Sequence, residues 1–174
     1  DLLTFSTSGL QTLEVSISNV NGLINDFNSG NDSLSMQIEA VDYATLGNRD
    51  YIYYHASSAL PNCPLVLVCH GYGGNAQDIM DYSQFNALAE EFGFAVCYPQ
   101  GTLDGSNTTF FNVGYDFQNN QTVDDVAFVE NLVDSLQAMH SLSEQDVFCT
   151  GMSNGGDFSY MLACQASETF KAVA

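Results

Sequence analysis

Residues 151–156 read Gly-Met-Ser-Asn-Gly-Gly and contain the pattern G-x-S-x-G, which can carry a nucleophilic serine. An apolar run precedes the pattern, and apolar residues at helical spacing follow it, so Ser153 lies on a predicted strand-to-helix turn. Glycines suit so sharp a turn, because side chains there would clash with the strand and the helix. The turn leaves the hydroxyl exposed, and we therefore predict that Ser153 is a nucleophile for acyl transfer.

A second glycine-rich pattern, His-Gly-Tyr-Gly-Gly at residues 70–74, follows the apolar run 65–69. Acyl transfer places negative charge on the attacked carbonyl oxygen, and backbone N–H groups stabilise that charge. In hydrolases with a G-x-S-x-G turn, one N–H belongs to the residue after the serine and another to a loop after an earlier strand. We therefore expect the oxyanion-hole amides at Tyr72 and Asn154.

Three apolar runs, near 65–69, 94–98 and 146–150, predict strands that are buried on both faces of a parallel sheet. Helical stripes lie between and after these runs, and the last residues, 170–174, predict a fourth parallel strand. Thr122 is predicted to cap the second helix through a capping box with Asp125. Strands alternating with helices indicate an α/β fold.

Two alternating segments come earlier in the chain. The alternation at Leu13, Val15 and Ile17 predicts a strand on a polar N-terminal extension. A second alternation, over 36–40, is expected to pair antiparallel with the strand 49–55. The parallel sheet should therefore carry antiparallel strands at its N-terminal side.

The polar loop 99–121 carries several aromatic residues just after a parallel strand. This position is the carboxyl edge of the sheet, where binding sites of α/β proteins form. The aromatic residues either line a substrate cleft or pin the loop to the domain. We take Phe111 and Tyr115 as candidate substrate-binding residues.

Charge sets this sequence apart, because only Arg49 and Lys171 are basic while 21 residues are acidic, for a formal net charge of -19. Such a surface repels phosphate backbones and anionic lipids, so we expect neither nucleic-acid nor membrane partners. The acidity weakly suggests an extracellular setting. Five cysteines without C-x-x-C spacing predict no metal site and do not settle the compartment.

Together with residues 97–102 (Cys-Tyr-Pro-Gln-Gly-Thr) and 123–128 (Val-Asp-Asp-Val-Ala-Phe), the two glycine-rich patterns resemble the α/β-hydrolase family of polyhydroxybutyrate-depolymerase-like and feruloyl esterases. The resemblance covers residues from about 46 to the end. It implies an α/β-hydrolase fold and secreted hydrolysis of carboxylic esters by a Ser-His-Asp triad, without metal or cofactor. It also implies phenolic or acetyl esters of polysaccharide as substrates, or else polyesters. The sequence departs from the pattern in lacking tryptophan, with Phe111 where one is expected.

The histidine and the acid of a triad are missing at their expected places, since they follow the serine in these hydrolases. His55, His70 and His140 all precede Ser153, and His70 is expected to shape the turn after its strand. We therefore expect residues 1–33 to be an extension and residues 34–174 to be the N-terminal part of a hydrolase domain, truncated after the nucleophile helix. Its partner would be the C-terminal part of the same domain.

Two alternatives stay open. One is a serine peptidase on the same fold. The other is a non-catalytic binding domain that lacks the triad.

Overall fold

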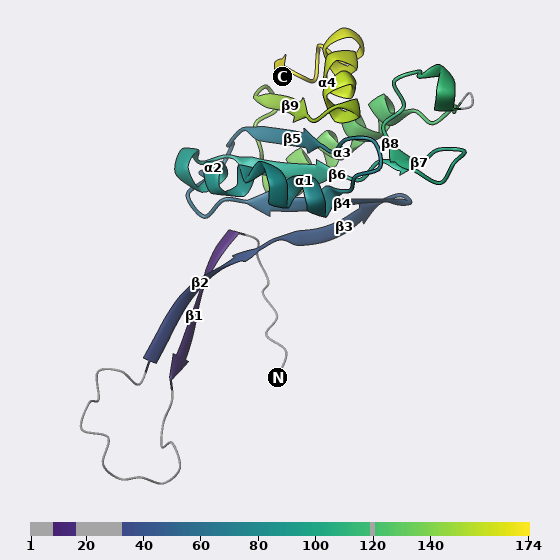
Figure 1. Cartoon of the computed structure of the whole chain (residues 1–174). Coiled ribbons are helices and arrows are strands. Elements are labelled where there is room, and N and C mark those ends of the chain that lie inside the picture. Colours follow the sequence, from purple (N-terminus) through teal and green to yellow (C-terminus); the bar gives the residue numbers. More distant parts are fainter. Residues whose placement is uncertain (1–8, 17–32, 119–120) are drawn as a thin grey trace, which may run out of the picture.

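A six-stranded sheet forms the centre of the protein, whose computed structural model describes residues 9–16, 33–118 and 121–174. The strands lie in the order β10-β9-β5-β6-β4-β3 (Figure 1). They are β3 (Asp42–Leu46), β4 (Arg49–His55), β5 (Leu65–Cys69), β6 (Ala95–Pro99), β9 (Val147–Gly151) and β10 (Ala172–Val173). The last four are parallel, while β3 and β4 run antiparallel. The predicted fold, a mostly parallel sheet with antiparallel N-terminal strands, is confirmed.

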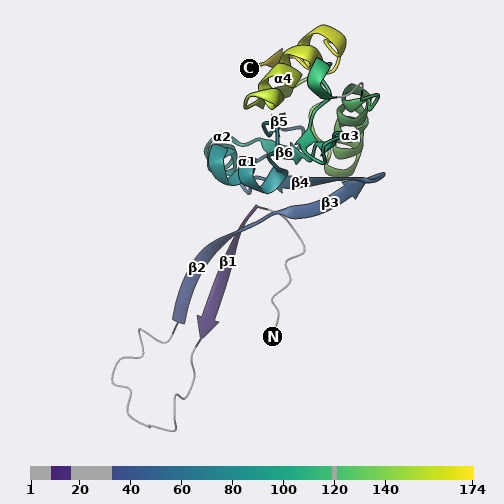
Figure 2. The same cartoon turned by 45° about the vertical axis from the view of Figure 1, so that its right-hand side comes forward.

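Helices cover both faces of this sheet (Figures 1 and 2). The helices are α1 (Ala76–Ser83), α2 (Phe85–Phe92), α3 (Asp125–His140) and α4 (Asn154–Gln165). Side chains of α1 and α2 pack with Ile52, Val68 and Val96 on one face, and those of α3 and α4 pack with Leu65 and Leu67 on the other. A short hairpin of β7 (Thr102–Leu103) and β8 (Thr109–Phe110) and the single turn η2 (Asp116–Gln118) lie in the loop after β6.

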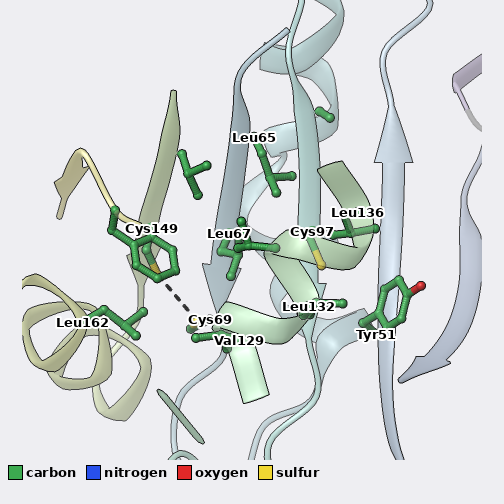
Figure 3. Packing of buried hydrophobic residues seen from close by; sticks show 14 of the residues in the cluster. Tyr51, Leu65, Leu67, Cys69, Cys97, Val129, Leu132, Leu136, Cys149 and Leu162 are labelled. Atoms are coloured by element: carbon green, nitrogen blue, oxygen red, sulfur yellow. Dashed lines mark hydrogen bonds between the residues drawn. The ribbon is translucent and has the colours of Figure 1, made fainter. Parts of the chain in front are cut away.

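The core on the α3 side follows the predicted helical stripe. Val129, Leu132 and Leu136 of α3 are fully buried against β5 and β6 (Figure 3). All five cysteines are free thiols, and four of them are buried. In the same cluster the sulfur atoms of Cys69 and Cys149 lie 3.8 Å apart. Cysteine therefore acts here as a small apolar residue of adjoining strands.

The N-terminal strands pair differently from the prediction. The strand expected around residues 13–17 is β1 (Gly9–Ser16), with Ile17 outside the described residues. The strand β2 (Ser33–Ala40) pairs with β1 in a separate two-stranded sheet, and the antiparallel partner of β4 is β3. The predicted pairing of 36–40 with 49–55 is thus wrong. A two-residue turn at 47–48 places Leu46 opposite Arg49. Residues 42–46, directly before the turn, therefore pair with β4 in place of residues 36–40.

The start of α3 also differs from the prediction. Its N-cap is Asp124, whose carboxylate accepts the N–H of Ala127 at 2.9 Å, and Thr122 lies before the helix. The predicted capping box from Thr122 to Asp125 is therefore wrong. Asp125 instead points into the protein, where its side chain is completely buried.

Asp125 forms a buried ion pair with Arg49, one of the two basic residues of the chain. The guanidinium of Arg49 also donates to the carbonyl of Gln100, at 2.8 and 3.2 Å, and stacks 3.9 Å from the ring centre of Phe128. The second carboxylate oxygen of Asp125 accepts the N–H of Asn112 at 2.6 Å. One ion pair thus joins β4 and α3 to the start of the loop that follows β6, at Gln100, and to its middle, at Asn112.

No helix in the described part of the chain is long and apolar enough to span a membrane.

We predict that Arg49→Ala lowers the free energy of unfolding by about 3–5 kcal/mol, because it leaves the Asp125 carboxylate buried without its counter-charge. Urea denaturation measures the change. Lys171→Ala is the matched control, since its ion pair with Asp146 is exposed and should contribute less than about 1 kcal/mol. Equal losses in the two variants would contradict the role given to the Arg49 pair.

Candidate active site

Ser153 lies on the turn between β9 and α4, at the carboxyl edge of the parallel strands. Its backbone has φ 53° and ψ -116°, a conformation that costs a non-glycine residue on the order of 1–3 kcal/mol. The residue is exposed. Backbone strain of this kind collects at functional sites, and here it holds a hydroxyl clear of the sheet.

Close backbone contacts make this turn possible. A Cβ on Gly155 would overlap the carbonyl oxygens of Cys69 and His70, and a Cβ on Gly151 would overlap the carbonyl of Gly155. The first turn of α4 therefore rests directly on the end of β5. Only glycine at both positions permits that approach.

The loop at residues 70–74 lies against the same turn. A Cβ built on Gly71 would come within 3.5 Å of the Ser153 Cβ, and the N–H of Met152 donates to the carbonyl of Cys69 at 3.1 Å. Among the residues that the structure describes, the backbone N–H groups of Tyr72 and Asn154 have no hydrogen-bond acceptor. Two N–H donors and a serine hydroxyl thus come from adjoining segments, an arrangement that can hold a developing oxyanion.

The side chain of Asn154 has a task separate from its backbone. It is buried, its Oδ1 accepts the N–H of Phe111 at 2.8 Å, and its Nδ2 donates to the carbonyl of Phe111 at 2.9 Å. The ring of Phe111 is also fully buried, stacked on Phe158 at 4.9 Å and 4.8 Å from His70. Phe111 was a candidate substrate-binding residue, and the loop aromatics were expected either to line a cleft or to pin the loop. The structure places Phe111 in the core, where it pins the loop beside the serine.

His70 is buried with both ring nitrogens engaged. Its Nδ1–H donates to the carbonyl of Gly71 at 2.7 Å, and its Nε2 accepts the N–H of Gly101 at 2.9 Å. Because a backbone N–H can only donate, Nε2 must be unprotonated. Burial lowers the pKa of His70, which favours this neutral form. The ring therefore shapes the loop, as predicted, and offers no free nitrogen to Ser153.

The other two histidines lie at the opposite end of the sheet. His55 pairs in register with Ala95, the first residue of β6, and its Nδ1 contacts the hydroxyl of Tyr53 at 2.8 Å. His140, at the C-terminal end of α3, stacks on Tyr53 with ring centres 4.2 Å apart. Neither is placed to act as a base for Ser153.

Tyr115 lies at the exposed side of the site. Its hydroxyl donates to Asp157 in the first turn of α4, and its ring stacks on Phe117 at 5.0 Å. Phe117 in turn meets the ring of Tyr72 edge-on at 5.7 Å, and the Tyr72 hydroxyl donates to Asp104. Phe117 was not singled out from the sequence, although its aromatic character within the same loop was a usable signal. These three rings form an aromatic rim beside the oxyanion loop.

No metal-binding cluster accompanies the site. Within the described ranges, no group of three or more His, Cys, Asp or Glu side chains is arranged to hold a metal ion.

The strand order and the serine turn after a central parallel strand define an α/β-hydrolase fold. The chain belongs to the family described as Esterase PHB depolymerase, whose model matches residues 49–174. It is 27% identical over 126 residues to a bifunctional acetylxylan esterase/xylanase of Neocallimastix patriciarum, covering 72% of this chain and 17% of that protein. It is 27% identical to feruloyl esterase B of Thermothelomyces thermophilus, covering 65% and 38%.

Among solved structures, a poly(3-hydroxybutyrate) depolymerase of Bordetella parapertussis matches with a TM-score of 0.59 and 22% identity, covering 77% of this chain and 50% of that one. This likeness supports the fold. The chain spans less than half the length of these two curated relatives.

We predict that Asn154→Ala lowers the free energy of unfolding by about 2–3 kcal/mol, because it leaves the buried N–H and carbonyl of Phe111 unpaired. Asn131→Ala is the matched control. Its side chain donates to the Ala127 carbonyl on the exposed face of α3, and its loss should cost under about 1 kcal/mol. Denaturant unfolding measures the loss of unfolding free energy in both variants. A loss in Asn154→Ala no larger than that in Asn131→Ala would contradict the stabilising role given to the hydrogen bonds between Asn154 and Phe111.

We also predict that the free energy of unfolding falls at acid pH, because His70 binds a proton more readily in the unfolded chain. Burial lowers its pKa from the ordinary 6.5, so the unfolded chain binds more protons than the folded one between the two values. Stability from this group is therefore complete above pH 6.5 and declines as the pH falls below it. Burial lowers the pKa of His55 and His140 in the same direction.

The His70→Gln variant should show a smaller loss of unfolding free energy between about pH 7.5 and about pH 5.5 than the unchanged protein does. Urea midpoints across this range measure it. Parallel pH profiles for the two proteins would show that His70 does not titrate with unfolding.

Proposed function

We propose that this chain carries the nucleophile and the oxyanion hole of a serine esterase that hydrolyses carboxylic esters. The observation that carries the proposal is the strained, exposed Ser153 beside the unpaired N–H groups of Tyr72 and Asn154. This geometry supports the proposal that the turn is a nucleophile elbow. Membership of the Esterase PHB depolymerase family, and similarity to an acetylxylan esterase/xylanase and a feruloyl esterase, support the same chemistry.

In the proposed mechanism, the Ser153 hydroxyl attacks the ester carbonyl and the resulting oxyanion accepts hydrogen bonds from the Tyr72 and Asn154 amides. Collapse of this intermediate expels the alcohol and leaves an acyl-serine, which water then hydrolyses. Both attacks need a base, and the three histidines of the chain are committed elsewhere. We propose that the base and its acid come from the C-terminal part of the same domain, as the greater length of the relatives supports.

The net charge and the aromatic rim support the substrate class that the family resemblance implies. A net charge of -19 disfavours anionic substrates, nucleic acid and anionic membranes. The rings of Tyr72, Tyr115 and Phe117 offer an apolar face beside the serine, which suits the acyl group or sugar of a neutral ester. We propose acetyl or phenolic esters linked to polysaccharide, and an extracellular location where such polymers occur. No cofactor is needed for this chemistry.

We predict that Ser153→Ala in the whole protein lowers the rate of p-nitrophenyl acetate hydrolysis by about 10⁴-fold or more, since no other group supplies the nucleophile. Ser167→Ala is the matched control, because Ser167 is exposed beyond the C-terminal end of α4. Its activity should equal that of the unchanged protein. A fluorophosphonate probe should label Ser153, as read by peptide mass spectrometry.

Equal rates from the Ser153→Ala and Ser167→Ala proteins would overturn the nucleophile assignment. A whole protein inactive on esters and unlabelled by the probe would favour the non-catalytic binding domain. Cleavage of peptide substrates, lost in Ser153→Ala, would favour a serine peptidase.

A further inference from the structure

A cavity of about 480 Å³ lies between β3, β4 and the start of α1, away from the Ser153 turn. The strand register places Tyr43 opposite Ile52 and Thr45 opposite Asp50, so that these four side chains share one face of the sheet. Asn75 and Gln77 approach from the α1 side. Because β3 is the outermost strand, the cavity is open to solvent along its edge.

Tyr43 gives this cavity an exposed aromatic wall of fixed orientation. Its side chain is 67% exposed, yet its hydroxyl donates to the Gln77 Oε1 at 2.5 Å, which anchors the ring to α1. An apolar ring face bordered by polar side chains matches the chemistry of a sugar, which has apolar C–H faces and a rim of hydroxyl groups.

Unused acceptors lie beside this ring. Over the described residues, the Asp50 carboxylate and the Thr45 hydroxyl make no hydrogen bond, and both residues are exposed. A carboxylate has four lone-pair sites and can accept from several hydroxyl groups. The strongly negative surface disfavours an anionic ligand, and a single carboxylate is too few ligands for a cation. The occupant that fits is neutral and rich in hydroxyl groups.

Gln100, which lines the cavity, also contacts a residue of the candidate active site. Gln100 donates from its backbone to the Asp50 carbonyl at 3.0 Å, and its Oε1 accepts the N–H of Ala76 at 2.9 Å. Its amide nitrogen lies 3.3 Å from the Nε2 of His70, whose ring holds the oxyanion loop. Three strand spacings, about 15 Å in all, separate β4 at the cavity from β9 at the Ser153 turn. A polymer is long enough to occupy the cavity and the Ser153 site together, whereas a small ester is not.

We propose that this cavity is a sugar subsite that binds one neutral pyranose unit of a polysaccharide whose ester group reaches Ser153. The contribution of this subsite to ester hydrolysis rests on the proposed esterase function. Binding of the sugar itself does not depend on it, since none of the cavity residues is part of the serine turn.

The first test is calorimetric titration of the protein with xylohexaose and cellohexaose, which carry no ester. Binding of either is expected, and Tyr43→Ala should weaken it about tenfold through loss of the ring face. Tyr82→Ala is the matched control, because Tyr82 is 75% exposed on α1 but does not line the cavity. Its affinity should be unchanged. No binding of either sugar, or equal affinity in Tyr43→Ala, would overturn the subsite.

The second test is steady-state kinetics of the whole protein on acetylated xylan and on p-nitrophenyl acetate. Tyr43→Ala should raise KM for the polymer about tenfold and leave kcat/KM for the small ester unchanged. Equal effects on both substrates would overturn the subsite, because Tyr43 would then act through the fold. If neither substrate is hydrolysed, the esterase proposal fails, while the titration still decides the cavity.

Discussion

The contact of the first turn of α4 with the end of β5 is the constraint on which this structure depends. Gly155 faces the carbonyl oxygens of Cys69 and His70 so closely that a methyl group there would overlap them. This contact sets the serine turn beside the loop that follows β5, and so brings Ser153 and the Tyr72 amide together. The chain accepts an unfavourable backbone conformation at Ser153 because packing on both sides holds it in place.

Buried polar groups, rather than apolar packing alone, hold the loops around this contact. His70 joins the loop after β5 to Gly101, and Asn154 joins α4 to Phe111. The ion pair of Arg49 and Asp125 holds Gln100 and Asn112 of the loop that follows β6. The side chains of His70, Asn154, Arg49 and Asp125 all have hydrogen-bond partners, and such networks favour a single arrangement because any broken link leaves an unpaired polar atom. These bonds therefore hold the segments that carry the Tyr72 and Asn154 amides in place, while the aromatic rim at Tyr115 and Phe117 lies toward solvent.

The errors of sequence interpretation share one physical origin. Alternation predicted β1 and β2 but not β3, and it carries no information about which strand is the neighbour, so the pairing of β2 with β1 was not foreseen. Asp125 was assigned to a capping box with Thr122, yet it is a buried partner of Arg49, which is 76 positions earlier in the chain. Phe111 was taken as a candidate substrate-binding residue because it is aromatic and lies in a loop at the sheet edge, although pinning of the loop was the open alternative. Its burial under His70 and Phe158 depends on contacts between distant segments.

The sequence by itself determined the elements of this protein and the identity of its candidate nucleophile. Apolar runs, glycine positions and helical stripes are local patterns, and each follows from the conformational preferences of a few adjoining residues. Only the tertiary structure decided that Phe111 is buried in the core, that His55 and His140 lie at the opposite end of the sheet from Ser153, and that Tyr43 borders a cavity. Those outcomes depend on sheet order and register, which arise from packing between segments far apart in the chain.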